Sequence, residues 1–466
     1  MRRVFTGLFL AALVSLPALG QEQKRLDELE RRAAEQQKEL EALREAEELR
    51  RAGDAPPHVE RPSGTPAEQT FSWGYDDGFF VRGSFFADPE AEPKDPGVTY
   101  LLRPRAYIQL DYRGYAHSRA NLAFPSKGVA DDHFVLRRAV IGFVADLGPF
   151  SFMFEAEPVR GASGLIPLLN AWLEWRSFEV LQVRAGHFIP PFTLADAFTA
   201  PPFYDFVEEP MIVQSLTYSF RPGAMAKGSF EKGLVSWFLA VNNEVDTNGT
   251  VTGDPIATTR LSSAVGPVQL GAAGAWERRA GVQPSLVAST PGVFQFFAPV
   301  NVQGWTQRYE VDLAVGSGPF FGSTEFCWGH QERRRVLPGG LSADSLVVQG
   351  AYGTVGWMFC GPPPGVKGPH VPFEGWELFS LDLERHRNAR NVGAELLVRL
   401  EWLSVGAGDL KGNDARAVSV GLNVYPMENV KFMLDFDHAR IGDQATAERA
   451  HSRYADEVQF RAQLEF

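Results

Sequence analysis

Residues 100–114 read YLLRPRAYIQLDYRG, and this stretch decides the fold class. Polar and apolar residues alternate along it, as they do in a β-strand whose successive side chains point to opposite faces. The apolar face carries Leu102, Pro104, Ala106, Ile108, Leu110 and Tyr112; the polar face carries Arg103, Arg105, Tyr107, Gln109, Asp111 and Arg113. Such a strand suits a soluble sheet with one wet face, or a membrane barrel with a wet lumen and a lipid-facing wall.

The two-residue period recurs along the chain after residue 71. With 100–114 it predicts about sixteen strands, near 134–147, 150–158, 168–176, 179–188, 215–230, 233–242, 257–265, 268–278, 305–315, 319–331, 346–359, 392–404, 416–425, 430–440 and 456–466. An even number of strands suits an antiparallel barrel whose ends meet. We therefore predict an all-β fold, a 16-stranded antiparallel transmembrane β-barrel over residues 71–466, with a short extra strand at 79–86 outside the barrel proper.

The connections between these strands alternate in length. Tight turns are expected at Asp146–Pro149 and Pro426–Asn429, whereas residues 189–214, 243–256, 279–304 and 360–391 form long loops. Short turns at one end and long loops at the other are typical of bacterial outer-membrane barrels. The sequence ends on Phe466, directly after an alternating strand, and a terminal aromatic in that position is also typical of such barrels.

The N-terminal segments predict export and oligomerisation. Arg2 and Arg3, the apolar run 4–16 and the small residues Ala18 and Gly20 form a cleavable signal peptide over residues 1–20. Residues 22–51 predict a periplasmic coiled-coil helix, with heptad positions at Leu26, Leu29, Ala33, Gln36, Leu40, Leu43 and Glu47. A solvated single helix is the alternative, because so short a coil is marginal alone. Residues 52–70, rich in Pro and Gly, read as a linker.

Composition and motifs exclude several functions. The net charge of -12 argues against nucleic acid as a partner. Cys327 and Cys360 could pair in an oxidising compartment, but their spacing leaves this open. The nine histidines lack metal-ligand spacing, and no nucleophile-elbow, zinc-protease or phosphate-loop motif occurs. We therefore expect no catalytic residue, no metal site and no cofactor.

Several stretches resemble the outer-membrane porins of the phosphate-selective O and P family. These stretches are Phe134–Ala139 with its Arg-Arg pair, Asn170–Trp172, Val183–Phe188, Pro190–Phe192, Gly421–Pro426 and Phe460–Phe466. The resemblance covers residues 100–466 in pieces, and the order of the pieces makes it specific. It implies a 16-stranded barrel that forms a homotrimer and admits anions such as phosphate or polyphosphate.

Fixed charges on the lumen wall would select the ions that pass. Period-two phasing nominates eight pore-lining residues: Arg103, Arg105, Arg113, Arg138, Arg184, Arg221, Lys227 and Arg260. The forked donors of guanidinium, which match phosphate, favour Arg103, Arg105, Arg138 and Arg184 among them. The same phasing places Arg137 with Ala139 and Ile141 on the outer face. Acidic residues fall on the lumen side in similar number, so structural Arg–Glu pairs across the wall are the alternative role for each cation.

The sequence thus predicts a porin of a Gram-negative outer membrane, in contact with lipid and open to small hydrophilic solutes or anions. Its mechanism is passive diffusion, narrowed by residues 189–214 folded into the lumen. Two other hypotheses are a lipase-like outer-membrane barrel enzyme and a secreted all-β binding protein. The first requires a Ser and His pair on the outer wall, and the second requires solubility without detergent.

Overall fold

The computed structural model describes residues 71–75, 79–85, 98–115, 132–158, 167–231, 234–245, 251–291, 295–297, 299–361, 393–408, 410–427, 429–442 and 454–465. The chain divides into two units, residues 1–68 and 69–466, and the described residues all belong to the second. The signal peptide (1–20), the coiled coil (22–51), the linker (52–70) and the terminal Phe466 therefore lie outside the described residues. No helix in the described part is long and apolar enough to cross a membrane.

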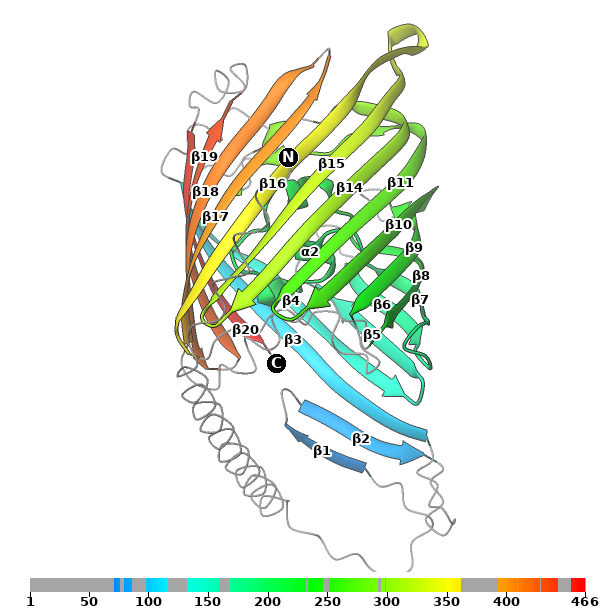
Figure 1. The fold of residues 1–466 in the computed structure, drawn as a ribbon, viewed down its shortest axis with the longest axis vertical. Helices are drawn as coiled ribbons and strands as arrows, with labels where there is room; N and C mark the ends of the chain where they lie inside the picture. The colour runs from blue at the N-terminus through cyan, green and yellow to red at the C-terminus, as the bar shows by residue number, and fades with distance from the viewer. Residues whose placement is uncertain are drawn as a thin grey trace, which may run out of the picture. The chain divides into compact units, whose positions relative to one another are not determined.

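Sixteen antiparallel strands among the described residues form one closed barrel (Figure 1). They are β3 (Val98–Tyr115), β4 (His133–Leu147), β5 (Phe150–Ala156), β6 (Leu168–Trp175), β7 (Gln182–Phe188), β8 (Arg221–Phe230), β9 (Val235–Val245), β10 (Val251–Val265), β11 (Val268–Pro284), β14 (Asn301–Ser317), β15 (Phe320–Leu337), β16 (Leu341–Cys360), β17 (Gly393–Ala407), β18 (Leu410–Met427), β19 (Val430–Ile441) and β20 (Tyr454–Glu465).

The barrel closes where the last strand meets the first. β20 pairs antiparallel with the second half of β3, from Glu457 opposite Tyr115 to Glu465 opposite Tyr107. The first half of β3 pairs with β2 (Phe79–Phe85), which in turn pairs with β1 (Phe71–Tyr75). The extra strand predicted at 79–86 is confirmed outside the closed wall, and β1 was not predicted.

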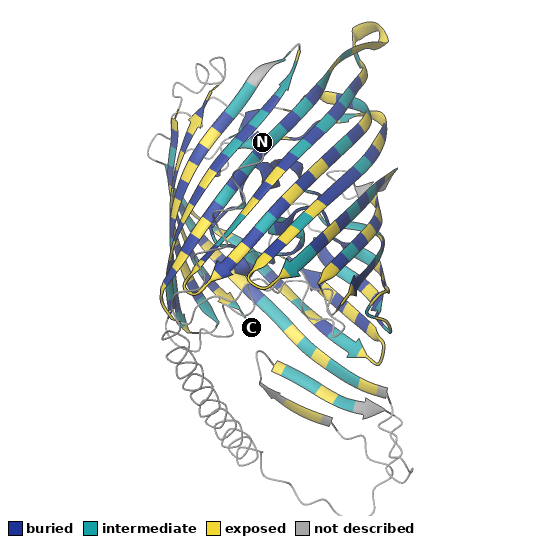
Figure 2. Cartoon of the chain, viewed as in Figure 1, coloured by how far each residue is buried: buried dark blue, intermediate teal, exposed yellow. Residues whose placement is uncertain are grey.

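Burial alternates residue by residue around the wall (Figure 2). On β19, Phe432, Leu434 and Phe436 are 39–48% exposed, whereas Met433 and Asp435 between them are 1% exposed. The outer face is thus aliphatic and aromatic, and most charged side chains point inward. A soluble sheet would expose its polar face to water, and large contiguous apolar surfaces on a protein mark contact with another phase or partner. The wall therefore fits lipid outside, as the period-two pattern predicted.

Glycine followed by proline shapes three of the short turns. Gly148, Gly266 and Gly318 have φ values of 53°, 56° and 58°, and each precedes a proline. A residue with a Cβ would be strained by roughly 1 kcal/mol in this left-handed region. The turn predicted at Asp146–Pro149 is among them, and the turn predicted at Pro426–Asn429 joins β18 to β19.

Several predicted boundaries are wrong. The strand predicted at 215–230 begins only at Arg221, because residues 211–216 form a short helix inside the barrel. The loop predicted at 243–256 is mostly strand, since β9 runs to Val245 and β10 begins at Val251. The loop predicted at 279–304 contains the end of β11, the start of β14 and a small hairpin, β12 (Ala288–Ser289) with β13 (Gln295–Phe297). Hydrogen bonding to a neighbouring strand extends the ladders beyond the alternating sequence.

Neither cysteine takes part in a disulfide bond. Cys327 is buried on β15, and Cys360 is exposed at the end of β16. The disulfide left open by the sequence is therefore not formed.

Replacing Leu434 with Arg tests the lipid-facing assignment. A cation in the middle of a lipid-facing strand is expected to destabilise the barrel by about 2–4 kcal/mol. The matched control is Leu341→Arg, because Leu341 is 65% exposed at the tip of the β15–β16 hairpin. Urea unfolding in phospholipid vesicles, followed by tryptophan fluorescence, measures both variants. Equal stability of the two variants would contradict the assignment.

Candidate functional site

Residues 189–220, between β7 and β8, fold into the barrel. This inward loop contains helix α2 (Leu194–Ala197), the 3-10 turn η2 (Pro201–Phe203) and helix α3 (Met211–Leu216). Prolines interrupt it at 190, 191, 201, 202 and 210, and because proline lacks an N–H and fixes φ, none of these helices can lengthen across them. The prediction that residues 189–214 fold inward agrees with the structure, in which the segment extends to 220.

Carboxylates of the wall accept hydrogen bonds from the inward loop. Glu325 accepts from the backbone N–H groups of Leu194 and Ala195, at 3.0 and 2.8 Å. These are the first amides of α2, whose N-cap Thr193 makes no side-chain cap. Glu401 accepts from the Met211 N–H at the start of α3, at 2.6 Å. The wall thus supplies the caps that the first turn of a helix needs.

Cations of the wall donate to the carbonyls of the same loop. Four such bonds are formed, at 2.6–3.0 Å: Arg260 to Phe192 O, Arg308 to Leu216 O, Arg399 to Glu208 O and Lys431 to Tyr204 O. These side chains come from β10, β14, β17 and β19. The inward loop is therefore fastened to the β10–β19 side of the wall.

A second segment joins the inward loop near the long-loop end of the barrel. Residues of the β12–β13 hairpin region pack with α3 and with inward residues of β16 and β17 in one buried apolar cluster. The cluster includes Met211, Ile212, Leu216, Leu286, Phe296, Phe297, Leu346, Val348, Leu403 and Val405. The alternation alone suggested an interior that is polar throughout. This cluster shows that part of the interior is apolar.

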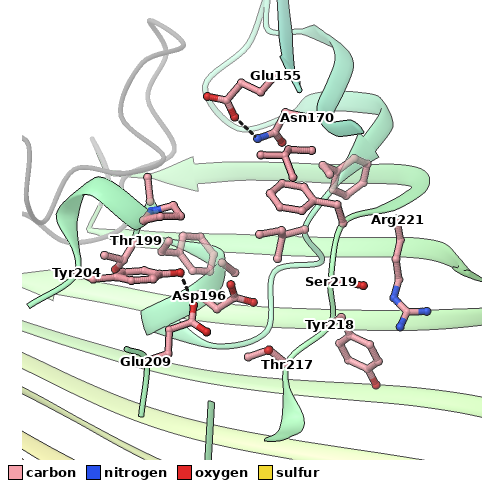
Figure 3. A pocket seen from close by; sticks show the side chains of 18 of the residues that line it. Glu155, Asn170, Asp196, Thr199, Tyr204, Glu209, Thr217, Tyr218, Ser219 and Arg221 are labelled. Carbon is pink, nitrogen blue, oxygen red and sulfur yellow. Dashed lines mark hydrogen bonds between the residues drawn. The ribbon is translucent and has the colours of Figure 1, made fainter. Parts of the chain in front are cut away.

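On the other side, between the inward loop and strands β3–β8, a cavity of about 510 Å³ remains open (Figure 3). Five arginines line it: Arg105, Arg137, Arg138, Arg184 and Arg221. Five acids also line it: Glu155, Glu157, Asp196, Glu208 and Glu209. Figure 3 shows Asp196, Tyr204 and Glu209 gathered on the loop side, with Arg221 and Tyr218 at a distance from them.

Several of these arginines are paired. Arg105 lies 3.4 Å from Glu155, and Arg184 donates to Glu174 at 2.7 Å while its guanidinium lies 3.8 Å from the centre of the Trp172 ring. Arg138 and Arg221 lie over tyrosine rings, with the guanidinium groups 6.0 Å from the centre of the Tyr204 ring and 5.3 Å from that of Tyr218.

Arg137 was assigned to the outer face, and this is wrong. Across the β3–β4 ladder, Arg138 faces Gln109 and Leu136 faces Leu110, so the register shifts and Arg137 has no cross-strand partner. This β-bulge turns both arginines inward, because an extra residue reverses the alternation. Arg137 then holds Glu208 with two hydrogen bonds of 3.2 and 3.3 Å. Period-two phasing could not have identified Arg137 as an inward residue. The only signal in the sequence at this position was the Arg-Arg pair.

The other nominated residues lie elsewhere. Arg260 is fully buried against Glu310 and Asp312, at 2.9 and 2.5 Å, and Lys227 is buried against Glu174 at 2.9 Å. Arg113 bonds Asp111 and Glu208, and Arg103 is half-buried on the inward face of β3. None of these four lines the cavity. Arg260 and Lys227 thus form ion pairs with carboxylates of the wall, as the structural alternative expects.

Burial and nearby charged groups shift the pKa values of two acidic residues on the inward loop. Burial alone would raise the pKa of Glu208, but the guanidinium groups of Arg137, Arg113 and Arg461 outweigh it and hold the pKa well below its usual range. Burial raises the pKa of Asp196 well above its usual range, and the nearby carboxylate of Glu209 raises it further. These neighbours therefore favour the charged form of Glu208, whereas burial favours the neutral form of Asp196.

Comparison with solved structures finds distant likeness. OmpT from the outer membrane of Vibrio cholerae is 9% identical, with 79% of this chain and 98% of that one covered at a TM-score of 0.49. An anion-selective porin from Comamonas acidovorans is 10% identical, with 79% and 100% covered at 0.48. The outer membrane channel DcaP of Acinetobacter baumannii is 10% identical, with 79% and 97% covered at 0.45. No curated protein matches the sequence.

A family model gives a firmer result. The model described as phosphate-selective porin O and P matches residues 108–285 and 295–466. The match includes the Arg137-Arg138 pair, the inward loop and most of the wall, and it takes in well over half of the chain. The resemblance inferred from the sequence is confirmed: the chain belongs to the phosphate-selective porin O and P family.

Proposed function

We propose that this porin lets small hydrophilic anions, phosphate among them, diffuse passively across the outer membrane through the cavity beside the inward loop. The observation that carries the proposal is the row of arginines on β3–β8 facing that cavity inside an apolar-walled, closed barrel. A channel is therefore favoured over an enzyme. Phosphate is the anion that the description of the family names.

Two of the cavity arginines would do most of the selecting. The carboxylates of Glu155 and Glu208 are offset by Arg105 and Arg137, so those pairs contribute little net field. Arg138 and Arg221 lie over the rings of Tyr204 and Tyr218 at the cavity wall, where their positive charges face an ion in the cavity. An ion of the opposite sign is stabilised in such a site and one of the same sign is excluded.

Export by residues 1–20 and assembly as a homotrimer belong to the same proposal. The heptad pattern of residues 22–51 supports oligomerisation, because three heptads gain stability when a larger body holds the copies together. Chemical cross-linking of the protein in native membranes would give a trimer band, and a monomer band alone would contradict the assembly.

Removing the two ring-stacked arginines should reduce anion preference. In the double variant Arg138→Gln/Arg221→Gln, the loss of each charge changes the energy of a nearby ion by about 1 kcal/mol, or roughly fivefold in permeability ratio. The reversal potential of single channels in a KCl gradient across a planar bilayer measures this ratio. The control Arg440→Gln removes an exposed charge on the outward face of β19.

The unmodified protein also tests the proposal. A reversal potential of the sign expected for chloride and phosphate supports the anion preference. A cation-selective potential would remove the anion preference and leave the channel itself intact. An unchanged potential in the double variant, beside an anion-selective parent, would show that ions pass elsewhere in the barrel.

Anion preference should also depend on pH through Asp196. Because its pKa is raised, Asp196 is neutral over a range in which an ordinary aspartate is charged. As the pH rises through this raised pKa, Asp196 ionises, the cavity gains a negative charge and anion preference falls. Asp196→Asn should flatten this dependence when reversal potentials are compared at several pH values.

The matched control for this titration is Asp205→Asn. Asp205 lies on the same inward loop but does not line the cavity. Its replacement should leave the pH dependence in place. If both variants behave like the parent, Asp196 is not the titrating group.

A further inference from the structure

On the neighbouring strands β11, β14 and β15, the side chains of the outward face change in type toward the same end of the barrel. On β15 the outward residues run from Phe326 through Trp328 and His330 to Glu332 and Arg334. On β11 the order is Leu270, then Trp276, then Arg278, and on β14 it is Val311, then Tyr309, then Trp305. Toward the long-loop end, β11 and β14 pass from aliphatic to aromatic outward residues, and β11 and β15 pass from aromatic to charged ones.

The aromatic residues form a continuous band across these strands. Trp276 and Tyr309 meet edge to face at 5.9 Å, Tyr309 and Trp328 lie 5.7 Å apart, and Trp328 stacks on His330 at 6.0 Å. Such aromatic bands lie at the boundary between hydrocarbon and headgroups. The end with the longer connections is the external one in bacterial barrels. The arginines just beyond the band therefore lie at the headgroup level of the outer leaflet.

These arginines line a groove of about 990 Å³ on the outer wall. Its lining includes four arginines and one carboxylate: Arg278, Arg279, Arg334, Arg335 and Asp254. Arg279 is paired with Glu277 at 2.9 Å, and Arg334 is paired with Glu332 at 2.8 Å. Among the described residues, no carboxylate lies within ion-pair distance of Arg278 or Arg335.

Local geometry fixes the groove. Gly304, at a φ of 114°, sits in a register shift between β14 and β15, and a Cβ there would come within 2.3 Å of Glu332. The same irregularity lets the Trp305 N–H donate to Glu332 at 2.7 Å, which orients Glu332 and the Arg334 attached to it. Arg335 itself has a φ of 51°, in the region that favours glycine. The chain thus keeps an arginine where backbone conformation alone would favour glycine.

We infer that this groove binds the phosphorylated headgroup of a lipid of the outer leaflet. Arg278 and Arg335 supply positive charge and forked donors that match a phosphate. Trp276 and Trp305 in the lining provide apolar contact for the part of the lipid below the headgroup. The inference uses the outer face of the barrel and is separate from transport, which uses the inner one.

Native mass spectrometry of the full chain in non-ionic detergent tests it. The probes are lipid A carrying two phosphates and the same lipid after enzymatic dephosphorylation. The phosphorylated form should be retained at least tenfold better. The double variant Arg278→Gln/Arg335→Gln should weaken its binding by roughly thirtyfold, and each single variant by several-fold.

The matched control removes the same charge elsewhere on the outer face. Arg416 and Arg440 face each other across β18 and β19, are exposed and lie outside the groove. Arg416→Gln/Arg440→Gln should leave binding within twofold of the parent, and an equal loss would overturn the groove in favour of general surface charge.

Two further results would overturn the inference. Equal retention of the phosphorylated and dephosphorylated probes would show that phosphate is not recognised. Displacement of the lipid by millimolar inorganic phosphate would assign the groove to a soluble anion instead. Unaltered single-channel conductance of the double variant, together with its heat-modifiable mobility in gels, confirms that the barrel is intact in each experiment.

Discussion

Closure of the sheet is the constraint from which the rest of the molecule follows. In hydrocarbon an unpaired backbone N–H or C=O costs several kcal/mol, so a spanning sheet has no room for a free edge. Pairing of β20 with β3 removes that edge, although the two strands lie at opposite ends of the chain. Once every strand has two neighbours, its side chains can point only outward to lipid or inward. The alternation between apolar and charged residues is the direct result.

The charged residues turned inward serve two different purposes. On the β10–β19 side, Arg260, Arg399 and Glu401 form hydrogen bonds with the backbone of the inward loop, and Arg399 also pairs with Glu401. Charges buried in this way are stable only because each is matched by hydrogen bonds. On the β3–β8 side the loop is held at Glu208 by Arg113 and Arg137, and a cavity is left between the loop and the wall. The attachment of one loop therefore decides which inward arginines are buried against protein and which line the cavity.

The residues on the outer face of the barrel change in type along the direction across the membrane. Aliphatic residues in the middle of the wall, aromatic residues beyond them and arginines beyond those follow the polarity profile of half a bilayer. On β11, β14 and β15 this profile is interrupted by a register shift that opens a groove. In the two proposals, the same wall faces a solute in water on its inner side and a lipid headgroup on its outer side.

Much of the fold could be predicted from the sequence, because the two-residue alternation of a strand is visible in residues that are neighbours along the chain. The number of barrel strands, the inner and outer faces of β3 and β19, the tight turn at Gly148 and the inward course of residues 189–214 were all predicted, and the ordered motifs identified the family. The inward turn of Arg137, the burial of Arg260 and the extension of β10 to Val251 were not. Each of these depends on a cross-strand register or on a contact between residues far apart in the chain. Local pattern determined which residues face inward along a regular strand; only tertiary contacts decided where a bulge breaks that pattern, and which inward charges are bound by protein rather than left to the cavity.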